Sequence, residues 1–199
     1  MRLGYHYHIT AISNNGAIKT FAQQGLFLDS LAIYFDKIFC FLYSPRESEI
    51  PLIDYEIKNK NIILIDIGTN KPVYHRSIFF NNKLKQIYKN DIVFVRGPTP
   101  TLPSIILKAA NVSTAVLLVG DYRLGVDEIP QSNWRRSLIK AWTVFYQAKQ
   151  KKALSRSLVL VNNKLLYNES KQITTNTKLV FTSTLFKSVF FKRDDTCLN

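Results

Sequence analysis

Short apolar runs alternate with amphipathic runs along most of the chain. Seven short runs are strand-like, and most of them are β-branched and apolar on both faces, which is typical of parallel strands covered by helices on both faces. In chain order they are RLGYHYHIT, KIFCFLY, NIILIDI, DIVFVRG, STAVLLVG, SLVLVN and KLVFTST. Each run is short enough to be a single strand rather than a buried helix.

Helical patterns fall between these strands. Residues 20–35 carry apolar side chains near helical spacing, and Thr20 is a plausible N-cap. Residues 77–89, 102–110 and 133–156 continue the alternation. Alternating strands and helices with short connections predict βαβ units, and hence an α/β fold. We expect a Rossmann-like, three-layer, doubly wound and mostly parallel sheet of about seven strands in a single domain.

The C-terminal segment does not follow this alternation. Residues 186–199, FKSVFFKRDDTCLN, are apolar in part but contain no clear partner element. We therefore predict one domain over residues 1–185 and a linker or strap over residues 186–199.

Composition narrows the class of protein. The chain has 46% hydrophobic and 21% charged residues, an ordinary globular composition. Cys40 and Cys197 form no disulfide or zinc pattern, and Cys40 is expected to be a buried thiol in a reducing compartment. No apolar run approaches the ~20 residues of a membrane span. We expect a cytoplasmic protein, or one peripheral on the inner face of the membrane.

Charge is the unusual feature of the composition. Lys and Arg number 27 against 14 Asp and Glu, a net charge of +13. Such an excess favours an anionic partner, although it also promotes solubility and does not specify the partner. No helix-turn-helix, RRM or zinc-finger pattern accompanies it, so we do not expect nucleic acid as a partner.

Ligands of open parallel sheets bind beyond the carboxyl ends of the strands, so the loops that follow strands hold the candidate site residues. Four lie in the first loop, which we expect to precede a helix N-terminus that could face phosphate or carboxylate. Five follow later strands. The candidates are Asn14, Asn15, Gly16, Ala17, Arg96, Asp121, Arg123, Asn162 and Lys164.

Each candidate also has a purely structural interpretation. The first loop matches neither GxGxxG nor the P-loop pattern, and a plain turn fits it equally well. Arg96 could clamp an anion, pair with a structural carboxylate, or lie exposed at the rim. Asp121 could accept hydrogen bonds from sugar hydroxyls, act as a base, or cap its turn. Asn162 and Lys164 could face a ligand or begin a short helix.

Two histidines share one face of the first strand. His6 and His8 have no Cys, Asp or Glu at ligand spacing nearby, so buried and hydrogen-bonded histidines are favoured over a metal pair. No metal is expected, and no Ser-His-Asp or Cys-His arrangement is present.

The long helical segment, residues 133–156, has a distinct pattern. Apolar and aromatic residues form one stripe, and most of the basic residues lie off it. A basic helix with aromatic residues can lie on an anionic membrane surface. We favour the alternative in which the stripe packs on the sheet and the charges are exposed, with the basic face able to contact lipid headgroups. The stripe consists of Trp134, Leu138, Ala141, Trp142, Phe145 and Ala148.

These segments together resemble a known family. The order GYHYHITAISNNGAIKTFAQQGLFLDSLA, DIVFVRGPTP, AVLLVGDY, WRRSLIKAWTVFYQAKQKKALSRS and LVLVNN is similar to the N-terminal half of a GT-B glycosyltransferase, in the retaining group of glycogen-synthase-like and polysaccharide-building enzymes. The resemblance covers about residues 1–185. The order of the elements carries it more than any one motif does, and the first loop lacks the double glycine of many members.

The resemblance implies a function. The N-terminal domain of such enzymes mainly holds the acceptor, often a lipid-linked or membrane-held glycan. A C-terminal domain with two glutamates in an E-x7-E pattern holds the nucleotide-sugar donor, which is a substrate, and no cofactor is expected. The loop of Asn15, Gly16 and Ala17 matches the family loop that approaches the donor diphosphate and the acceptor, and Asp121 and Arg123 match a stretch near the cleft. No catalytic residue is assigned.

The expected function is therefore that of the acceptor-binding half of a hexosyltransferase-type enzyme in polysaccharide or glycolipid biosynthesis. Because the donor domain is not among these residues, the chain is expected to be inactive alone. The alternative is a non-catalytic Rossmann-like module that binds a nucleotide or an anionic glycan.

Overall fold

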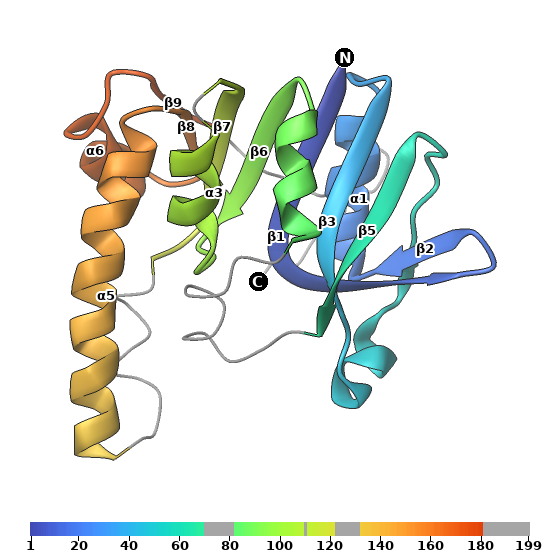
Figure 1. Ribbon diagram of the computed structural model, residues 1–199, viewed down its shortest axis with the longest axis horizontal. Coiled ribbons are helices and arrows are strands. Elements are labelled where there is room, and N and C mark those ends of the chain that lie inside the picture. Colours follow the sequence, from blue (N-terminus) through green and yellow to red (C-terminus); the bar gives the residue numbers. More distant parts are fainter. Residues whose placement is uncertain (70–81, 110, 122–131, 181–199) are drawn as a thin grey trace, which may run out of the picture.

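The computed structural model describes residues 1–69, 82–109, 111–121 and 132–180. These residues form an α/β structure built on a mixed, mostly parallel sheet (Figure 1). The sheet has nine strands within the described part of the chain. This architecture is compatible with a Rossmann-like fold. The expected linker, residues 186–199, lies outside the described residues.

All seven strands expected from the apolar runs are present, and they pair in parallel. They are β1 (Arg2–Asn14), β3 (Lys37–Ser44), β5 (Ile62–Thr69), β6 (Ile92–Gly97), β7 (Ser113–Leu118), β8 (Leu158–Val161) and β9 (Thr177–Leu179). Their order across the sheet is β5-β3-β1-β6-β7-β8-β9. The sheet therefore grows in one direction from β1 to β5 and in the other direction from β6 to β9.

Two short antiparallel strands were not expected from the sequence. β2 (Ala17–Thr20) pairs with the end of β1, and β4 (Tyr55–Glu56) pairs with β2. β1 is thus longer than its apolar run, because it continues past the parallel sheet into a hairpin.

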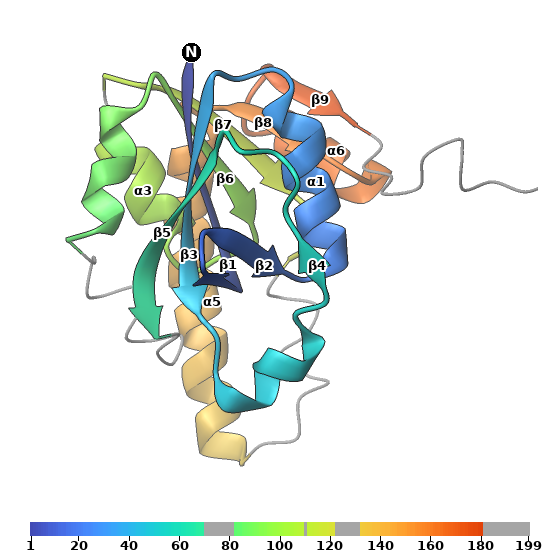
Figure 2. The ribbon, with the colours of Figure 1, turned by 90° about the vertical axis from the view of Figure 1, so that its right-hand side faces the viewer.

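Helices pack on both faces of the sheet. α1 (Ala22–Ala32) lies on one face and α3 (Leu102–Lys108) on the other (Figure 2). α1 contributes Leu28 and Ala32 to one buried apolar cluster. α3 and the end of α5 (Asn133–Leu154) contribute to a second cluster. Alternate side chains of β6 supply the two clusters, as the pleat of a strand requires.

The expected helix boundaries need correction at two places. Thr20 is not the N-cap of α1, because its hydroxyl donates to the Thr10 carbonyl within the hairpin; Asp54 instead accepts from the Ala22 N–H. The helix expected at residues 77–89 is, over its described part, the short 3-10 helix η2 (Leu84–Lys89). The remaining short elements are η1 (Glu47–Leu52), also 3-10, and α6 (Lys164–Lys171).

The aromatic stripe of α5 faces away from the protein, so the expectation that it packs on the sheet is wrong. α5 uses its other side for packing, with Thr143, Tyr146, Ala153 and Leu154 buried. Trp134, Leu138 and Phe145 are 68%, 60% and 60% exposed. Ala141 and Ala148 are also exposed, and only Trp142 is half-buried. The first half of α5 projects past the carboxyl ends of the neighbouring strands, where it has no sheet to cover (Figure 1).

Candidate functional site

Strand order reverses between β1 and β6. β1 lies between β3 and β6, and successive crossovers leave this point in opposite directions along the sheet. Open α/β sheets bind their ligands at the carboxyl ends of the strands at such a position. The residues that gather there form the candidate site.

Arg96 is the central side chain of this site. It lies near the end of β6, and it is 9% exposed. Its guanidinium carbon lies 5.0 Å from the Tyr7 ring centroid and 5.4 Å from that of Phe27, within the range of cation–π attraction. Arg96 is neither a rim residue nor, within the described part of the chain, a partner in any ion pair with a carboxylate.

One hydrogen bond orients the guanidinium. An Arg96 amine (Nη1) donates to Gln24 Oε1 at 3.0 Å, and Gln24 Nε2 donates to the Tyr5 hydroxyl at 2.8 Å. Arg96 Nε has no hydrogen-bond partner among the described residues. A buried cation without a counter-charge is costly, so this geometry suits an incoming anion that would accept from the guanidinium.

The two tyrosines beside Arg96 stay protonated at neutral pH. Burial raises the pKa of Tyr5 well above its ordinary value, and the positive charge of Arg96 opposes this rise only in part. Burial likewise raises the pKa of Tyr7, and the positive charge of Arg96 again opposes part of this rise. The site therefore presents one positive charge among neutral hydroxyl groups, so its net charge is positive.

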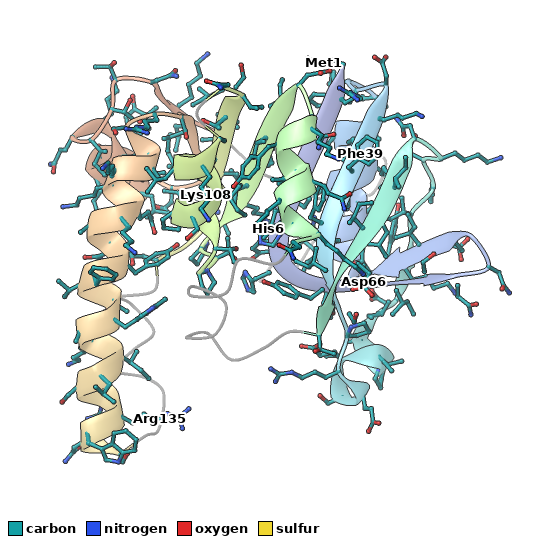
Figure 3. All side chains as sticks on the ribbon, viewed as in Figure 1. Met1, His6, Phe39, Asp66, Lys108 and Arg135 are labelled. Atoms are coloured by element: carbon teal, nitrogen blue, oxygen red, sulfur yellow. The ribbon has the colours of Figure 1, made fainter. Side chains whose placement is uncertain are left out.

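A second polar network fastens the same end of the sheet. His6 on β1 is fully buried, and its Nδ1 lies 2.7 Å from the Phe41 carbonyl oxygen (Figure 3). Its Nε2 lies 2.8 Å from Thr101 Oγ1, which is 3.1 Å from Thr99 Oγ1. The Tyr146 hydroxyl of α5 donates to the Thr99 carbonyl at 2.8 Å. The network joins β1, β3, the loop after β6 and α5.

This network confirms the structural interpretation of His6. Both ring nitrogens are engaged by protein groups, so neither is free to bind a metal. The described residues also contain no group of three or more His, Cys, Asp or Glu side chains that could hold a metal ion.

The first-loop candidates occupy the tip of the β1–β2 hairpin. Asn14 and Ala17 pair across it, and Asn15 and Gly16 turn the chain with φ of 50° and 82°. The expectation that this loop directly precedes a helix is wrong, because β2 separates it from α1. The four residues therefore cannot use the N–H groups of a helix start, although the exposed tip can still meet a ligand.

Asp121 lies at a different place, after β7. It lines a pocket of about 490 Å³ between β7, α5 and α6. Polar lining residues include Gln147 and Gln150 from α5 and Ser170 from α6. This pocket is separate from the point where the strand order reverses, between β1 and β6. The pocket lies at β7, on the far side of β6 from β1.

The remaining candidates are dispersed. Asn162 and Lys164 flank Asn163, whose side chain accepts from the Leu166 N–H at 2.8 Å and caps α6. The capping interpretation of this segment is thus confirmed for Asn163, and Lys164 is exposed. Arg123 lies outside the described residues.

Sequence analysis missed four residues of the site, which are Gln24, Tyr5, Tyr7 and Phe27. Gln24 is the polar residue of a helix whose neighbours on that face are buried, which is a detectable signal. Tyr5 and Tyr7 alternate with His6 and His8 along β1, and the contact of Tyr7 with Arg96 depends on strand pairing.

Comparisons with known protein families and curated proteins found no match to this chain. No protein-family model matches the chain, and no curated protein matches it. Among the described residues, no helix is long and apolar enough to cross a bilayer.

Proposed function

We propose that this chain is the acceptor-binding, Rossmann-like half of a nucleotide-sugar-dependent glycosyltransferase of the GT-B type, with a doubly wound sheet. The observation that carries the proposal is Arg96, a buried guanidinium without a carboxylate partner in the described part of the chain, held at the strand-order reversal. The family resemblance of the sequence supplies the reaction class.

Each part of the site has a role in this proposal. Arg96 attracts an anionic group of the acceptor or of the donor diphosphate, and Tyr7 and Phe27 hold its guanidinium plane. The exposed amides of Asn14 and Asn15 at the hairpin tip contact sugar hydroxyl groups. Asp121 and the glutamines of the pocket after β7 offer further acceptors and donors for a glycan.

A second Rossmann-like domain would supply the donor site in this proposal, so the 199-residue chain binds its acceptor without transferring sugar. The acceptor is a glycan or a lipid-linked glycan in polysaccharide or glycolipid biosynthesis. A membrane-held acceptor requires the enzyme to work peripherally on the inner face of the membrane.

The second candidate is a binding module without catalysis. The same unpaired guanidinium would serve a nucleotide or an anionic glycan equally well, since both present the oxygen acceptors that Arg binds.

Saturation-transfer NMR on the purified chain tests both candidates. The probes are UDP, UDP-glucose, and neutral and anionic oligosaccharides. We expect binding of an oligosaccharide, loss of this binding in Arg96→Met, and its retention in the matched control Arg156→Met on the exposed segment after α5. Binding of UDP without any oligosaccharide would favour the module. Turnover of UDP-glucose by the chain alone would contradict the proposed division between two domains.

A further inference from the structure

The outward face of α5 combines two properties. Its outermost line is apolar, formed by Trp134, Leu138 and Phe145 with Val144 beside it, all of them 60% exposed or more. At about 100° per residue, the first three fall within roughly 40° of one another around the helix axis. They therefore form one continuous ridge rather than scattered exposed residues.

Cations border this ridge on both sides. The helix contains six basic residues and no Asp or Glu: Arg135, Arg136, Lys140, Lys149, Lys151 and Lys152. Lys149 lies beside the ridge, with its Nζ 4.3 Å from the Phe145 ring centroid. On the other side of the helix, Lys140 and Lys151 lie within about 40° of Val144 around the helix axis. Arg135 marks the projecting end of the helix (Figure 3).

We infer that α5 is a membrane-docking helix, which lies flat on an anionic lipid bilayer with its ridge inserted among the acyl chains. An interfacial helix of this kind has apolar and aromatic residues on one face, Lys and Arg beside them, and a burial depth of about 5–10 Å. The inference stands apart from the proposed function, because it depends only on the exposure and charge of α5.

Charge complementarity selects the bilayer over other partners. A second copy of the chain, paired through the same face, would bring the cations beside one ridge against those beside the other. Nucleic acid would meet the apolar ridge before it met the lysines. An anionic bilayer accommodates both parts at once, since headgroups pair with the cations while the acyl region receives the side chains of the ridge.

The position of the ridge agrees with this role. The projecting half of α5 extends past the carboxyl ends of β7 and β8, at the end of the sheet that holds the candidate site (Figure 1). A bilayer on the outer side of α5 would lie beside that end.

Vesicle co-sedimentation of the full 199-residue chain gives the first test. We expect binding to vesicles of equal parts phosphatidylcholine and phosphatidylglycerol at low salt, weaker binding at high salt, and little binding to phosphatidylcholine alone. Each cation near a charged surface strengthens partitioning about fivefold, so Lys140→Gln with Lys149→Gln should weaken it about 25-fold. The matched control Lys37→Gln with Lys178→Gln, which removes two exposed lysines elsewhere, should change binding little.

The apolar ridge is tested by Leu138→Ser with Phe145→Ser. We expect at least a roughly tenfold loss of binding, because two large apolar side chains no longer leave water. The matched control is Ile33→Ser with Tyr34→Ser, since these residues are at least as exposed but lie after α1. Circular dichroism should show both double variants folded, because none of the four side chains is buried.

Both tryptophans of the chain lie on α5, which makes fluorescence a local probe. In a Trp142→Phe variant, Trp134 is the one remaining tryptophan. Its emission should shift to shorter wavelength with anionic vesicles and be quenched by brominated acyl chains. An unchanged Trp134 emission on sedimenting protein would overturn the inference, as would absence of binding at low salt. A dimer that buries the ridge without vesicle binding would overturn it too.

The two proposals fail separately. Arg96→Met should leave vesicle binding unchanged, and Leu138→Ser with Phe145→Ser should leave oligosaccharide binding unchanged.

Discussion

Arg96 on β6 donates a hydrogen bond to Gln24 on α1, although the two residues are 72 positions apart in the chain. Gln24 in turn donates to Tyr5 on β1, so one amide side chain joins three elements at the strand-order reversal. The amide oxygen accepts from the cation, and the amide nitrogen donates to the hydroxyl. All three side chains are buried, so these two hydrogen bonds satisfy polar groups that have little contact with bulk water.

The first prediction concerns this amide. Gln24→Ala should lower the free energy of unfolding by about 2–3 kcal/mol, because it leaves a buried cation and a buried hydroxyl with fewer partners. Urea denaturation measures the change. Gln23→Ala, one residue earlier and exposed, should cost less than about 0.5 kcal/mol. Equal effects of the two substitutions would show that the Gln24 bonds contribute nothing beyond helix propensity.

The second prediction concerns the tautomer of His6. The Phe41 carbonyl can only accept, so Nδ1 must carry a proton, and the neutral ring then accepts from the Thr101 hydroxyl at Nε2. Long-range proton–nitrogen NMR should show the Nδ1–H form, with the signal assigned by its loss in His6→Gln. A neutral Nε2–H form would contradict the arrangement of this network.

The third prediction concerns acid stability and Asp29 on α1. Burial of Asp29 acts to raise its pKa, but hydrogen bonds from Asn59, Lys58 and Tyr55 outweigh burial and hold the pKa below its ordinary value. A pKa that is lower in the folded state stabilises the protein above the unfolded pKa, and this contribution is lost as pH falls through the folded value.

Asp29→Asn should therefore cost about 1–2 kcal/mol at pH 7, and the cost should shrink progressively below pH ~4. Urea denaturation of both proteins across this range measures it. Glu47→Gln, on the exposed η1, serves as the control for the loss of one surface carboxylate. If the loss of unfolding free energy in Asp29→Asn stays constant with pH, the hydrogen bonds do not favour the ionised form of Asp29.

The fourth prediction concerns close packing at Gly25. A Cβ atom built there would overlap Tyr55 Cδ1, and the Tyr55 ring is anchored because its hydroxyl donates to Asp29. Gly25→Ala should therefore destabilise the protein by about 1–3 kcal/mol, although alanine favours a helix over glycine by about 1 kcal/mol.

A double-mutant cycle with Tyr55→Ala separates the two effects. In the Tyr55→Ala background, Gly25→Ala should become neutral or stabilising, because the ring no longer occupies the space. If Gly25→Ala costs the same in both backgrounds, the overlap with Tyr55 is not the cause.

Much of the fold could be predicted from local pattern. The seven apolar runs became the seven parallel strands, because a strand covered on both faces must be apolar at nearly every position. Cys40 is buried as expected, and burial raises the pKa of its thiol. The helices α1, α3 and α5 also lie within a few residues of their expected ranges.

The candidate site was predicted only in part. The sequence singled out Arg96 as a residue at a strand end, but it could not supply Gln24, Tyr7 and Phe27 around it. These contacts arise from the pairing of β1 with β6 and from the packing of α1 on the sheet. The hairpin of Asn15 and Gly16 was likewise hidden, since its pairing depends on where β1 leaves the parallel sheet.

The sequence by itself determined which segments are strands and helices, and it determined that α5 has an apolar stripe beside many cations. Periodicity is a local property, and it fixes which side chains share a face of a helix. Only the tertiary structure decided which way that face points. The sheet ends before α5 does, so the helix packs through Thr143, Tyr146, Ala153 and Leu154, and the stripe remains outside.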